Sequence, residues 1–355
     1  TPMKKLLYFG IYDRGYARTH VIQNGFRRNG WEVAECHVDP KKVKGLTKYL
    51  QLFRLGLEAR KLRYDLVIVG FPGQSVVWLA RLLFGKDIVL DAFLSLYDSN
   101  VSDRKLYSEH SWRAKKDRFL DIWSCRLSSK VLLDTNGNID YFVSKFGLPR
   151  NKFIRVFIGA DDTIFSPLDI PEEKEFTAHF HGTFIPLQGI RHIVDAAHIV
   201  RDKGIRFRIV GHGQDSKDID AHIRELNLEE VITRVPKVPV SEIPGIMGTA
   251  HVVFGIFGDS EKAMKAIPNK VFEAMAMGKC IVTADTPGIR ELTDAHKIFS
   301  LVPPADPEAL AQALLDLKND DTRRRMLGHS ARAAFERSLL PESIVADLLR
   351  TLQKT

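Results

Sequence analysis

The sequence predicts an α/β protein with two Rossmann-like, doubly wound parallel-sheet domains that face a central cleft. Short apolar runs alternate with helical stretches along the 355 residues, which is typical of strands buried between layers of helices. The alternation restarts after 166–175, a stretch with prolines and acidic residues but no apolar period. The chain length and its 45% hydrophobic content suffice for two cores.

The first domain, residues 1–165, is expected to contain six strands. Residues 4–10 form a continuous apolar run, which indicates a strand buried on both faces. A helix is predicted at 16–29, where Gly30 ends it. Further strands are predicted at 31–38, 66–70, 87–90, 130–133 and 153–157.

The second domain, residues 166–335, repeats this pattern. Its strands are predicted at 176–180, 206–210, 231–235, 251–256, 280–284 and 298–301. Its helices are predicted at 188–201, 217–226, 307–318 and 322–337. The last segment, 336–355, is expected to hold a helix that can cross back to the first domain. Ligands of such sheets bind at the carboxyl ends of strands, so the cleft between the domains is the expected site.

The segment 267–278, Ile-Pro-Asn-Lys-Val-Phe-Glu-Ala-Met-Ala-Met-Gly, carries the most chemical information. Pro268 suits the first turn of a helix, and Asn269 and Glu273 share one of its faces. Free N–H groups and the helix dipole attract an anion such as a diphosphate, and Lys270 adds a positive charge. The carboxylate of Glu273 can accept hydrogen bonds from a ribose diol. The alternative is a helix with Glu and Lys on a solvated face.

The run 269–278, followed by 280–283 and 286–291, resembles the nucleotide-sugar signature of GT-B glycosyltransferases of family 4. Three more segments resemble the family in order: 181–197 with Gly182 and Thr183, 207–213 with Gly211, and 234–239 with Pro236 and Lys237. The resemblance implies the GT-B fold and a nucleotide-sugar donor bound by the second domain. It also implies that Glu273 binds the ribose and that 234–239 grips the base.

The sequence departs from the family pattern where the diphosphate is held. Thr183 and Gln188 stand in the places of an Arg and a Lys, and Lys265 replaces a Glu. Glu261 fills that acidic role if the loop carries a four-residue insertion. We expect the cations Lys262, Lys265 and Lys270 to neutralise the diphosphate instead. The alternatives are an exposed basic loop, or a GT-B protein that no longer turns over.

The loop 10–15, Gly-Ile-Tyr-Asp-Arg-Gly, follows the first strand and is expected to face the cleft. Its glycines would let the backbone approach a sugar or phosphate, although a plain turn would need them equally. The acceptor-binding candidates from this region are Gly10, Asp13, Arg14, Gly15 and Arg18.

The stretch after the fourth strand supplies the candidates for the reaction centre. Asp91 and Asp98 are predicted there as catalytic residues with Glu261, and Ser95 lies between the two aspartates. Asp98 suits a helix cap or a turn equally well. A lone histidine such as His110 is more often structural. The retaining mechanism implied by the resemblance needs no strong enzymic nucleophile, because the leaving diphosphate can accept the proton.

The positive charge lies in the first half of the chain. Residues 1–165 contain 28 Lys and Arg against 17 Asp and Glu, whereas 166–355 contain 24 against 27. In the basic segment 41–63, leucines and a phenylalanine recur at helical spacing, which predicts a helix on an anionic membrane surface. The alternative is a helix whose apolar stripe faces its own sheet. Nucleic-acid binding is not expected, since no recognised module accompanies the charge.

These features together predict a function. Three scattered cysteines indicate a reducing, cytoplasmic setting, and the chain lacks an Asp-x-Asp motif, so neither a metal nor another cofactor is expected. We expect a glycosyltransferase of cell-surface polysaccharide biosynthesis, peripheral at the cytoplasmic membrane, that moves a sugar from a nucleotide-sugar to a glycan or lipid-linked acceptor. A non-hydrolysing sugar-nucleotide epimerase and a non-catalytic GT-B subunit are the alternatives. The base, sugar, acceptor, linkage and oligomeric state stay open.

Overall fold

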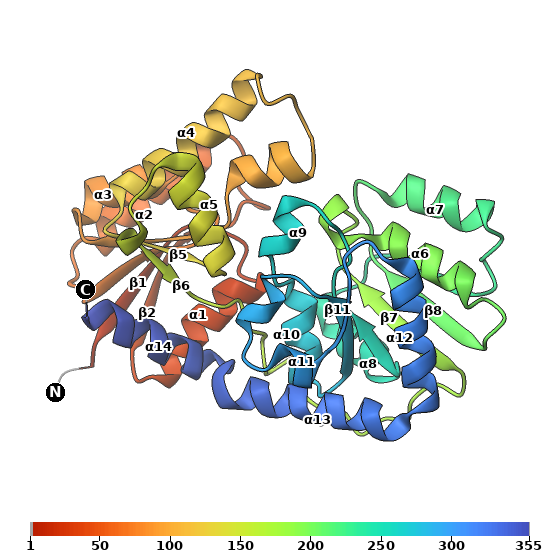
Figure 1. The fold of residues 1–355 in the computed structure, drawn as a ribbon. Helices are drawn as coiled ribbons and strands as arrows, with labels where there is room; N and C mark the ends of the chain where they lie inside the picture. Colours follow the sequence, from red (N-terminus) through yellow and green to blue (C-terminus); the bar gives the residue numbers. More distant parts are fainter. Residues whose placement is uncertain (1–2, 355) are drawn as a thin grey trace. The chain divides into compact units, whose positions relative to one another are not determined.

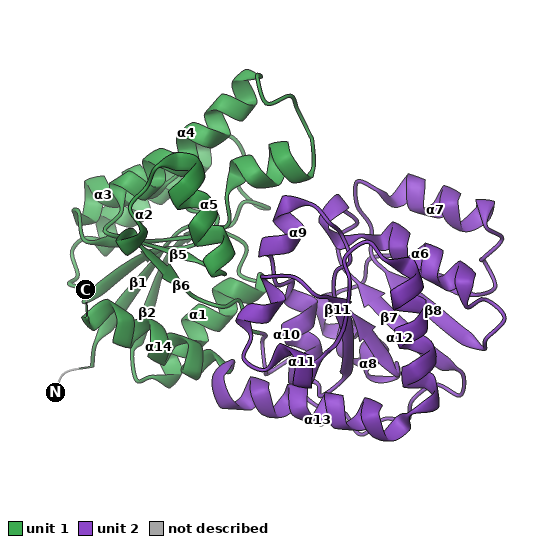
Figure 2. Ribbon diagram, viewed as in Figure 1, with its two compact units in different colours: residues 1–159, 340–355 green, residues 160–339 purple. Residues whose placement is uncertain are grey.

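The computed structural model describes residues 3–354, which form two compact units (Figure 2). Unit 1 comprises the chain up to Gly159 together with the segment from Leu340 onward, and unit 2 comprises Ala160–Leu339. The sequence suggested borders at 165/166 and 335/336. No helix within 3–354 is both long and apolar enough to cross a membrane.

Unit 1 is built on a parallel sheet of six strands in the order β2-β1-β3-β4-β5-β6 (Figure 1). All six strands predicted for the first half are present, and the direction of strand order reverses at β1, beside β3. The strands are β1 (Lys5–Ile11), β2 (Glu32–Val38), β3 (Leu66–Val69), β4 (Ile88–Phe93), β5 (Lys130–Leu133) and β6 (Phe153–Arg155).

Helices cover both faces of this sheet. The apolar side chains on one face pack against α2 (Thr47–Ala59), α3 (Val77–Phe84), α4 (Trp112–Leu127) and α5 (Asn136–Phe146). The other face packs against α1 (Ala17–Arg28) and α14 (Pro341–Gln353). Helices α1 and α14 touch closely, because a Cβ on Gly25 would lie 2.3 Å from the Pro341 carbonyl oxygen. The final helix therefore belongs to the core of unit 1.

Unit 2 repeats the architecture with the parallel order β12-β11-β10-β7-β8-β9. The direction of strand order reverses at β7, beside β10. The strands are β7 (Phe176–His181), β8 (Ile205–Val210), β9 (Ile232–Val235), β10 (Val252–Phe254), β11 (Cys280–Ala284) and β12 (Ser300–Val302). The two doubly wound sheets confirm the predicted fold class.

The helices of unit 2 are α6 (Ile190–Ile199), α7 (Ser216–Glu225), α8 (Ile243–Gly248), α9 (Glu261–Lys265), α10 (Asn269–Ala276), α11 (Ala295–Ile298), α12 (Pro307–Asn319) and α13 (Asp321–Ser338). The boundaries in unit 2 differ from the prediction by up to two residues, and two of these differences have a clear local cause. The helix expected from 188 starts at Ile190, because Gly189 has a left-handed φ of 63° and separates it from a short turn, Pro186–Gln188. Residues 295–298 form α11, so the last strand starts two residues late.

Candidate functional site

The carboxyl end of β7 brings together the polar side chains of the candidate site. This edge lies where strand order reverses, which is where doubly wound sheets bind ligands. His179 and His181 alternate along β7 and share one face of the strand, and α10 brings Lys270 and Glu273 to them. All four side chains are buried. Buried polar groups are costly unless they are paired, so their partners define the chemistry available here.

A chain of hydrogen bonds ends on Glu273. The Nε2 atom of His181 lies 2.7 Å from Glu273 Oε2, and the Nε2 atom of His179 lies 3.1 Å from His181 Nδ1. If His181 donates to the carboxylate from Nε2, its Nδ1 accepts the Nε2 proton of His179. Burial lowers the pKa of His179 well below its usual value, which keeps that ring neutral. No group among residues 3–354 hydrogen-bonds Glu273 Oε1, so this oxygen is available to a ligand.

Lys270 turns inward and contacts the loop after β7. Its Nζ donates to Oε1 of Gln188 and lies 3.8 Å from the ring centroid of Phe180. The same atom would lie 3.1 Å from a Cβ at Gly182. Burial lowers the pKa of Lys270 well below its usual value, and the nearby Glu273 carboxylate opposes that shift. An anion bound beside Gly182 would therefore favour the ammonium form of Lys270.

Two glycines let the ends of β7 and β8 meet. Gly211 has a φ of 129°, and a Cβ there would lie 2.0 Å from the Gly182 carbonyl oxygen. A Cβ at Gly213 would lie 2.4 Å from the Phe184 carbonyl oxygen. Backbone contact of this kind excludes any side chain. The resulting loop ends are rigid because the backbone N–H of Phe184 also donates to the His212 carbonyl.

A pocket of about 500 Å³ opens beside this contact, at the ends of β8 and β9. Three predicted donor-binding residues line it: Gly211, Pro236 and Lys237. Arg234 also lines the pocket, with its Nε 2.8 Å from Asp220 Oδ1 and its guanidinium over the Phe184 ring. The pocket is large enough for a nucleobase and ribose.

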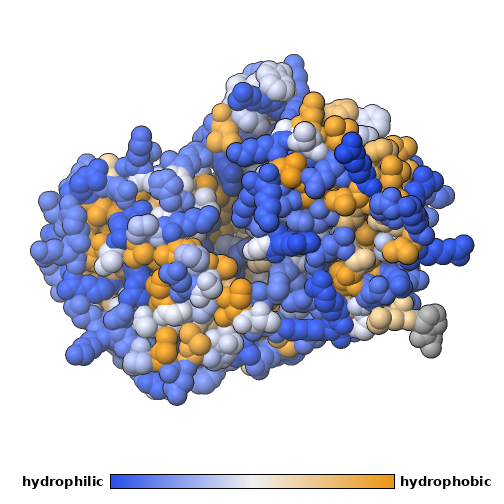
Figure 3. Space-filling view, turned by 180° about the vertical axis from the view of Figure 1, so that it is seen from behind, coloured by the Kyte–Doolittle hydropathy of each residue, from blue (hydrophilic) through white to orange (hydrophobic). Residues whose placement is uncertain are grey.

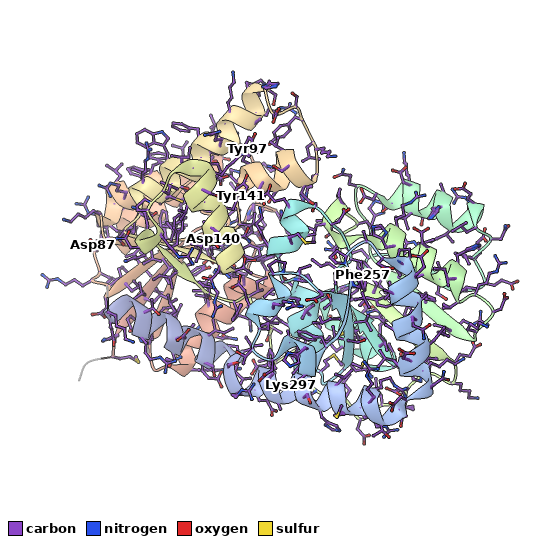
Figure 4. All side chains as sticks on the ribbon, in the orientation of Figure 1. Asp87, Tyr97, Asp140, Tyr141, Phe257 and Lys297 are labelled. Atoms are coloured by element: carbon purple, nitrogen blue, oxygen red, sulfur yellow. The ribbon has the colours of Figure 1, made fainter. Side chains whose placement is uncertain are left out.

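The loop from 183 to 189 is held in place by its neighbours. The backbone N–H of Phe257, labelled in Figure 4, donates to the Gln188 carbonyl over 3.1 Å. A Cβ on Gly189 would lie 2.4 Å from the Gly258 nitrogen. These contacts fix the backbone of Gln188, whose side chain accepts from Lys270. Thr183, by contrast, is exposed at the tip of the loop.

The remaining predicted donor residues lie on α9 and at the start of α10. Lys262 and Lys265 are only 7% and 9% exposed, so the alternative of an exposed basic loop is wrong for them. Lys265 Nζ lies 3.2 Å from Glu261 Oε1, and the Glu261 side chain is 70% exposed. Asn269 is half-buried in the first turn of α10. Helix α9 packs its apolar side against the 185–187 turn through Ala263.

In unit 1, the 10–15 loop is fixed by charged contacts. A Cβ on Gly10, whose φ is 152°, would lie 3.5 Å from the Gly70 carbonyl oxygen at the end of β3. Asp13 accepts from the backbone N–H of Gly15 over 2.9 Å and pairs with Lys41 over 2.5 Å. Arg14 is 64% exposed, and its Nε lies 3.1 Å from Glu35. Asp13 and Arg14 are thus within reach of solvent.

Arg18 and Asp91 form an ion pair inside unit 1. Both side chains have no exposed surface, and Arg18 Nε lies 2.7 Å from Asp91 Oδ1. Arg18 also donates to the Val156 carbonyl over 2.8 Å, so the pair joins α1, β4 and the segment after β6. Burial raises the pKa of Asp91, and Arg18 opposes that shift. A role for either residue at a ligand would require the pair to separate.

Asp98 is also buried, in the π-helix Asp98–Asp103 that follows β4. Its backbone N–H donates to Ser95 Oγ over 2.9 Å. Ser95 Oγ in turn donates to Asp121 on α4 over 2.6 Å, so this loop is tied to the helix behind it. The His110 side chain is 89% exposed beside Glu109.

Sequence reasoning gave no role to His179 or to His181, and it treated Gln188 only as a missing cation. The available signal was two histidines at i and i+2 in an otherwise apolar strand that ends at a glycine. Polar side chains in a buried strand are normally hydrogen-bonded to partners on neighbouring elements. Within residues 3–354, no group of three or more His, Cys, Asp or Glu is placed to hold a metal ion.

Comparisons with known proteins match the second half of the chain to a protein family. Residues 175–320 match the family model described as glycosyl transferases group 1. The chain is 31% identical over 192 residues, 51% of its length, to the Escherichia coli (strain K12) protein named "Putative colanic acid biosynthesis glycosyltransferase WcaL", of which this covers 45%. It is 25% identical over 327 residues to the amylovoran biosynthesis glycosyltransferase AmsK of Erwinia amylovora, covering 84% of this chain and 75% of AmsK. The chain spans about half the length of the first of these relatives.

Solved structures share the whole fold. The Anabaena protein Alr3699/HepE, crystallised in complex with UDP-glucose, superposes with a TM-score of 0.72 at 17% identity, over 99% of this chain and 100% of HepE. Sucrose-phosphate synthase from Thermosynechococcus elongatus superposes with a TM-score of 0.73 at 15% identity, over 99% of this chain and 98% of the synthase. At these identities the likeness establishes the fold.

Proposed function

We propose that this chain, whose residues 175–320 match the model of the group 1 glycosyltransferases and whose fold is GT-B, moves a sugar from a nucleotide-sugar donor to an acceptor with retention. The observation that carries the proposal is the set of Glu273, Lys270 and His181 at the carboxyl end of β7, beside the pocket of Gly211 and Pro236. A carboxylate with one free oxygen next to a buried amine suits a ribose diol followed by a diphosphate.

Each residue then has a role in donor binding. The base occupies the pocket at Pro236 and Lys237, and Glu273 Oε1 accepts from the ribose hydroxyls. Lys270 faces the diphosphate near Gly182, where its ammonium replaces the cation that the related family carries at the position of Gln188. The N–H groups at the start of α10, with Asn269, add a positive dipole end. Lys262 and Lys265 contribute further positive charge, and Glu261 is proposed to act near the transferred sugar.

The acceptor is proposed to be a glycan or lipid-linked sugar of a cell-surface polysaccharide. AmsK is named for amylovoran biosynthesis and WcaL for colanic acid biosynthesis, which supports this class of product. The 10–15 loop of unit 1, with Asp13 and Arg14, is the proposed acceptor contact, and Asp98 is proposed near the reaction centre. We place the protein in the cytoplasm, peripheral at the membrane through the basic segment 41–63, where reduced cysteines such as Cys36 persist.

The test is a thermal-shift screen of the full chain against UDP-, GDP-, ADP- and dTDP-sugars, followed by calorimetry with the best donor. HepE binds UDP-glucose, so UDP-sugars come first. A bound donor raises the unfolding temperature in proportion to affinity and concentration. The variant Glu273→Ala should weaken donor binding at least tenfold, whereas Glu308→Ala, at an exposed position on α12, should bind as the wild type does.

Three results would overturn parts of the proposal. Equal donor affinity in the wild type and Glu273→Ala would remove the ribose assignment. Conversion of the donor to its epimer without an acceptor would identify an epimerase. Absence of binding and turnover across all donors would favour a non-catalytic subunit.

A further inference from the structure

Three neighbouring helices of unit 1 present apolar side chains to solvent. Helices α2, α3 and α4 cover one face of the sheet, and their outer sides carry large apolar residues that the core does not use. We call these the docking face: Leu46, Leu50, Leu57, Trp78, Leu82, Trp112, Phe119 and Trp123. Figure 3 shows, for the side of the molecule it draws, how apolar patches lie among hydrophilic side chains.

The stripe on α4 is the clearest part of the docking face. Trp112, Phe119 and Trp123 recur at intervals of seven and four residues, so they lie on one side of the helix. Their exposed fractions are 68%, 54% and 45%, while Asp121 and Cys125 on the opposite side are buried. An ordinary surface helix turns such residues inward, whereas this one turns them outward.

Helices α2 and α3 repeat the arrangement. Leu46 and Leu50 are 80% and 61% exposed, whereas Phe53 of the same stripe packs against the core, so the alternative prediction of a stripe that faces the sheet is met only in part. On α3, Trp78 and Leu82 are exposed one turn apart. The helices are in contact, because a Cβ on Gly56 of α2 would lie 2.4 Å from Leu83 of α3. Arg81 of α3 donates to the Leu127 carbonyl at the end of α4 over 2.9 Å.

Positive charge surrounds these apolar residues. Exposed lysines and arginines on or beside the three helices are Lys42, Lys44, Arg54, Arg60, Lys61, Arg63, Arg81, Arg113, Lys115, Lys116, Arg118 and Arg126. Glu58 is the only acidic residue in α2, and the acidic residues of α4, Asp117 and Asp121, are buried. Asp87 after α3 and Glu109 before α4 are exposed, so basic residues still outnumber acidic ones around this face. A second copy of this face would meet it with like charge, so self-association through it is disfavoured.

We propose that the docking face binds the surface of an anionic lipid bilayer, with the tryptophans of α3 and α4 inserted among the headgroups. Tryptophan favours the membrane interface because its ring is apolar and its N–H is polar, and basic residues are attracted to anionic lipid. The proposal extends the peripheral placement above from 41–63 to α3 and α4. It is independent of the identity of the donor.

Tryptophan fluorescence tests the proposal directly. Three of the four tryptophans lie on the docking face, and the fourth, Trp31, packs against Phe26 beside α1. Vesicles of phosphatidylcholine with phosphatidylglycerol should shift the emission of the full chain to shorter wavelength, and lipids with brominated acyl chains should quench it. Vesicles of phosphatidylcholine alone should bind at least tenfold more weakly.

Matched variants distinguish binding through the docking face from nonspecific adsorption of the protein to vesicles. The triple variant Trp112→Gln, Phe119→Gln, Trp123→Gln should float with anionic vesicles at least tenfold less, and Lys115→Gln with Lys116→Gln should lose about fivefold per charge. The control Ile199→Gln with Met326→Gln removes two exposed apolar residues of unit 2 and should float as the wild type does. Circular dichroism and the donor thermal shift check that each variant is folded.

Two outcomes would overturn the proposal. One is a wild-type protein that binds neutral and anionic vesicles equally well, or that binds neither kind of vesicle. The other is a triple variant that is folded and binds as tightly as the wild type. Because donor binding is measured on the same samples, failure at the membrane leaves the proposed glycosyltransferase function standing.

Discussion

His181 Nε2 lies 2.7 Å from Glu273 Oε2, and this contact orients the carboxylate assigned to the donor ribose. The variant His181→Phe keeps the ring but removes the donor, so we expect the Kd for the donor to rise about 10- to 100-fold, since a hydrogen bond to a charged group is worth about 1.5–3 kcal/mol. Isothermal calorimetry measures this change.

The conservative variant His181→Gln can still donate a hydrogen bond and should recover part of the affinity. His296→Phe, at an exposed histidine of α11, is the matched control and should leave the Kd unchanged. If Phe and Gln at 181 weaken binding equally, the contact is a packing contact and the orienting role fails.

Lys270 makes donor binding depend on pH. Burial holds the pKa of the free amine well below its usual value, and a bound diphosphate would raise it. Between those two pKa values, binding takes up a proton, so donor affinity falls as the pH rises. Calorimetry in two buffers of different ionisation enthalpy, repeated at several pH values, should show a net proton uptake on binding, and Lys270→Arg, which stays charged, should abolish it. Buffer-independent enthalpies for the wild type would contradict the assignment.

The Arg18–Asp91 pair is expected to stabilise unit 1. Asp91→Asn leaves the Arg18 charge buried without its counterion, which should cost about 3–5 kcal/mol of unfolding free energy. The double variant Arg18→Met, Asp91→Leu should recover most of that loss. Asp140→Asn breaks an exposed pair with Arg150 (Asp140 is labelled in Figure 4) and should cost less than about 1 kcal/mol. Urea denaturation measures the unfolding free energy of all three variants.

Catalysis by Asp91 would give a different pattern. If Asp91→Asn keeps wild-type stability and donor affinity but loses turnover, the residue acts in the reaction rather than in the fold.

Asp121 should give unit 1 a stability that varies between about pH 4 and pH 7. Burial raises the pKa of this carboxyl to about 7, although it accepts from Ser95 and from the N–H of Tyr97. The raised folded pKa means that the native state holds the proton more tightly than the unfolded state does. The stabilisation is present below about pH 4 and is lost as the pH rises through 7. Each tenfold difference in proton affinity between the two states corresponds to about 1.4 kcal/mol of unfolding free energy.

The variant Asp121→Asn cannot titrate, so its stability relative to the wild type should increase across this pH range. Denaturant unfolding at pH 4.5, 6 and 7.5 measures the difference. A constant difference would show that the carboxyl has the same pKa in the folded and unfolded states.

Apolar periodicity and the positions of turn residues are enough to predict the twelve strands, because most of them are short stretches rich in apolar residues between turns or helices. Failures occurred at boundaries. Gly189 separates a tight turn from α6. Residues 295–298 form one helical turn before β12, and so short a segment, with only Ala295 and Ile298 buried, has no clear helical period in the sequence. The helix predicted within 41–63 is present as α2, but the sequence does not predict which side of this helix packs against the sheet.

Spacing and composition alone predict the two doubly wound sheets, the nucleotide-sugar signature around Glu273 and the excess of positive charge in the first half. Those properties reside in spacing and composition, which are local. The folded chain adds three contacts that spacing does not predict: His181 with Glu273, Lys270 with Gln188, and the ion pair of Arg18 and Asp91. Residues 82 to 92 positions apart meet because parallel strands bring their carboxyl ends to one edge. The spacing of residues along the chain does not predict which buried polar side chains will contact each other.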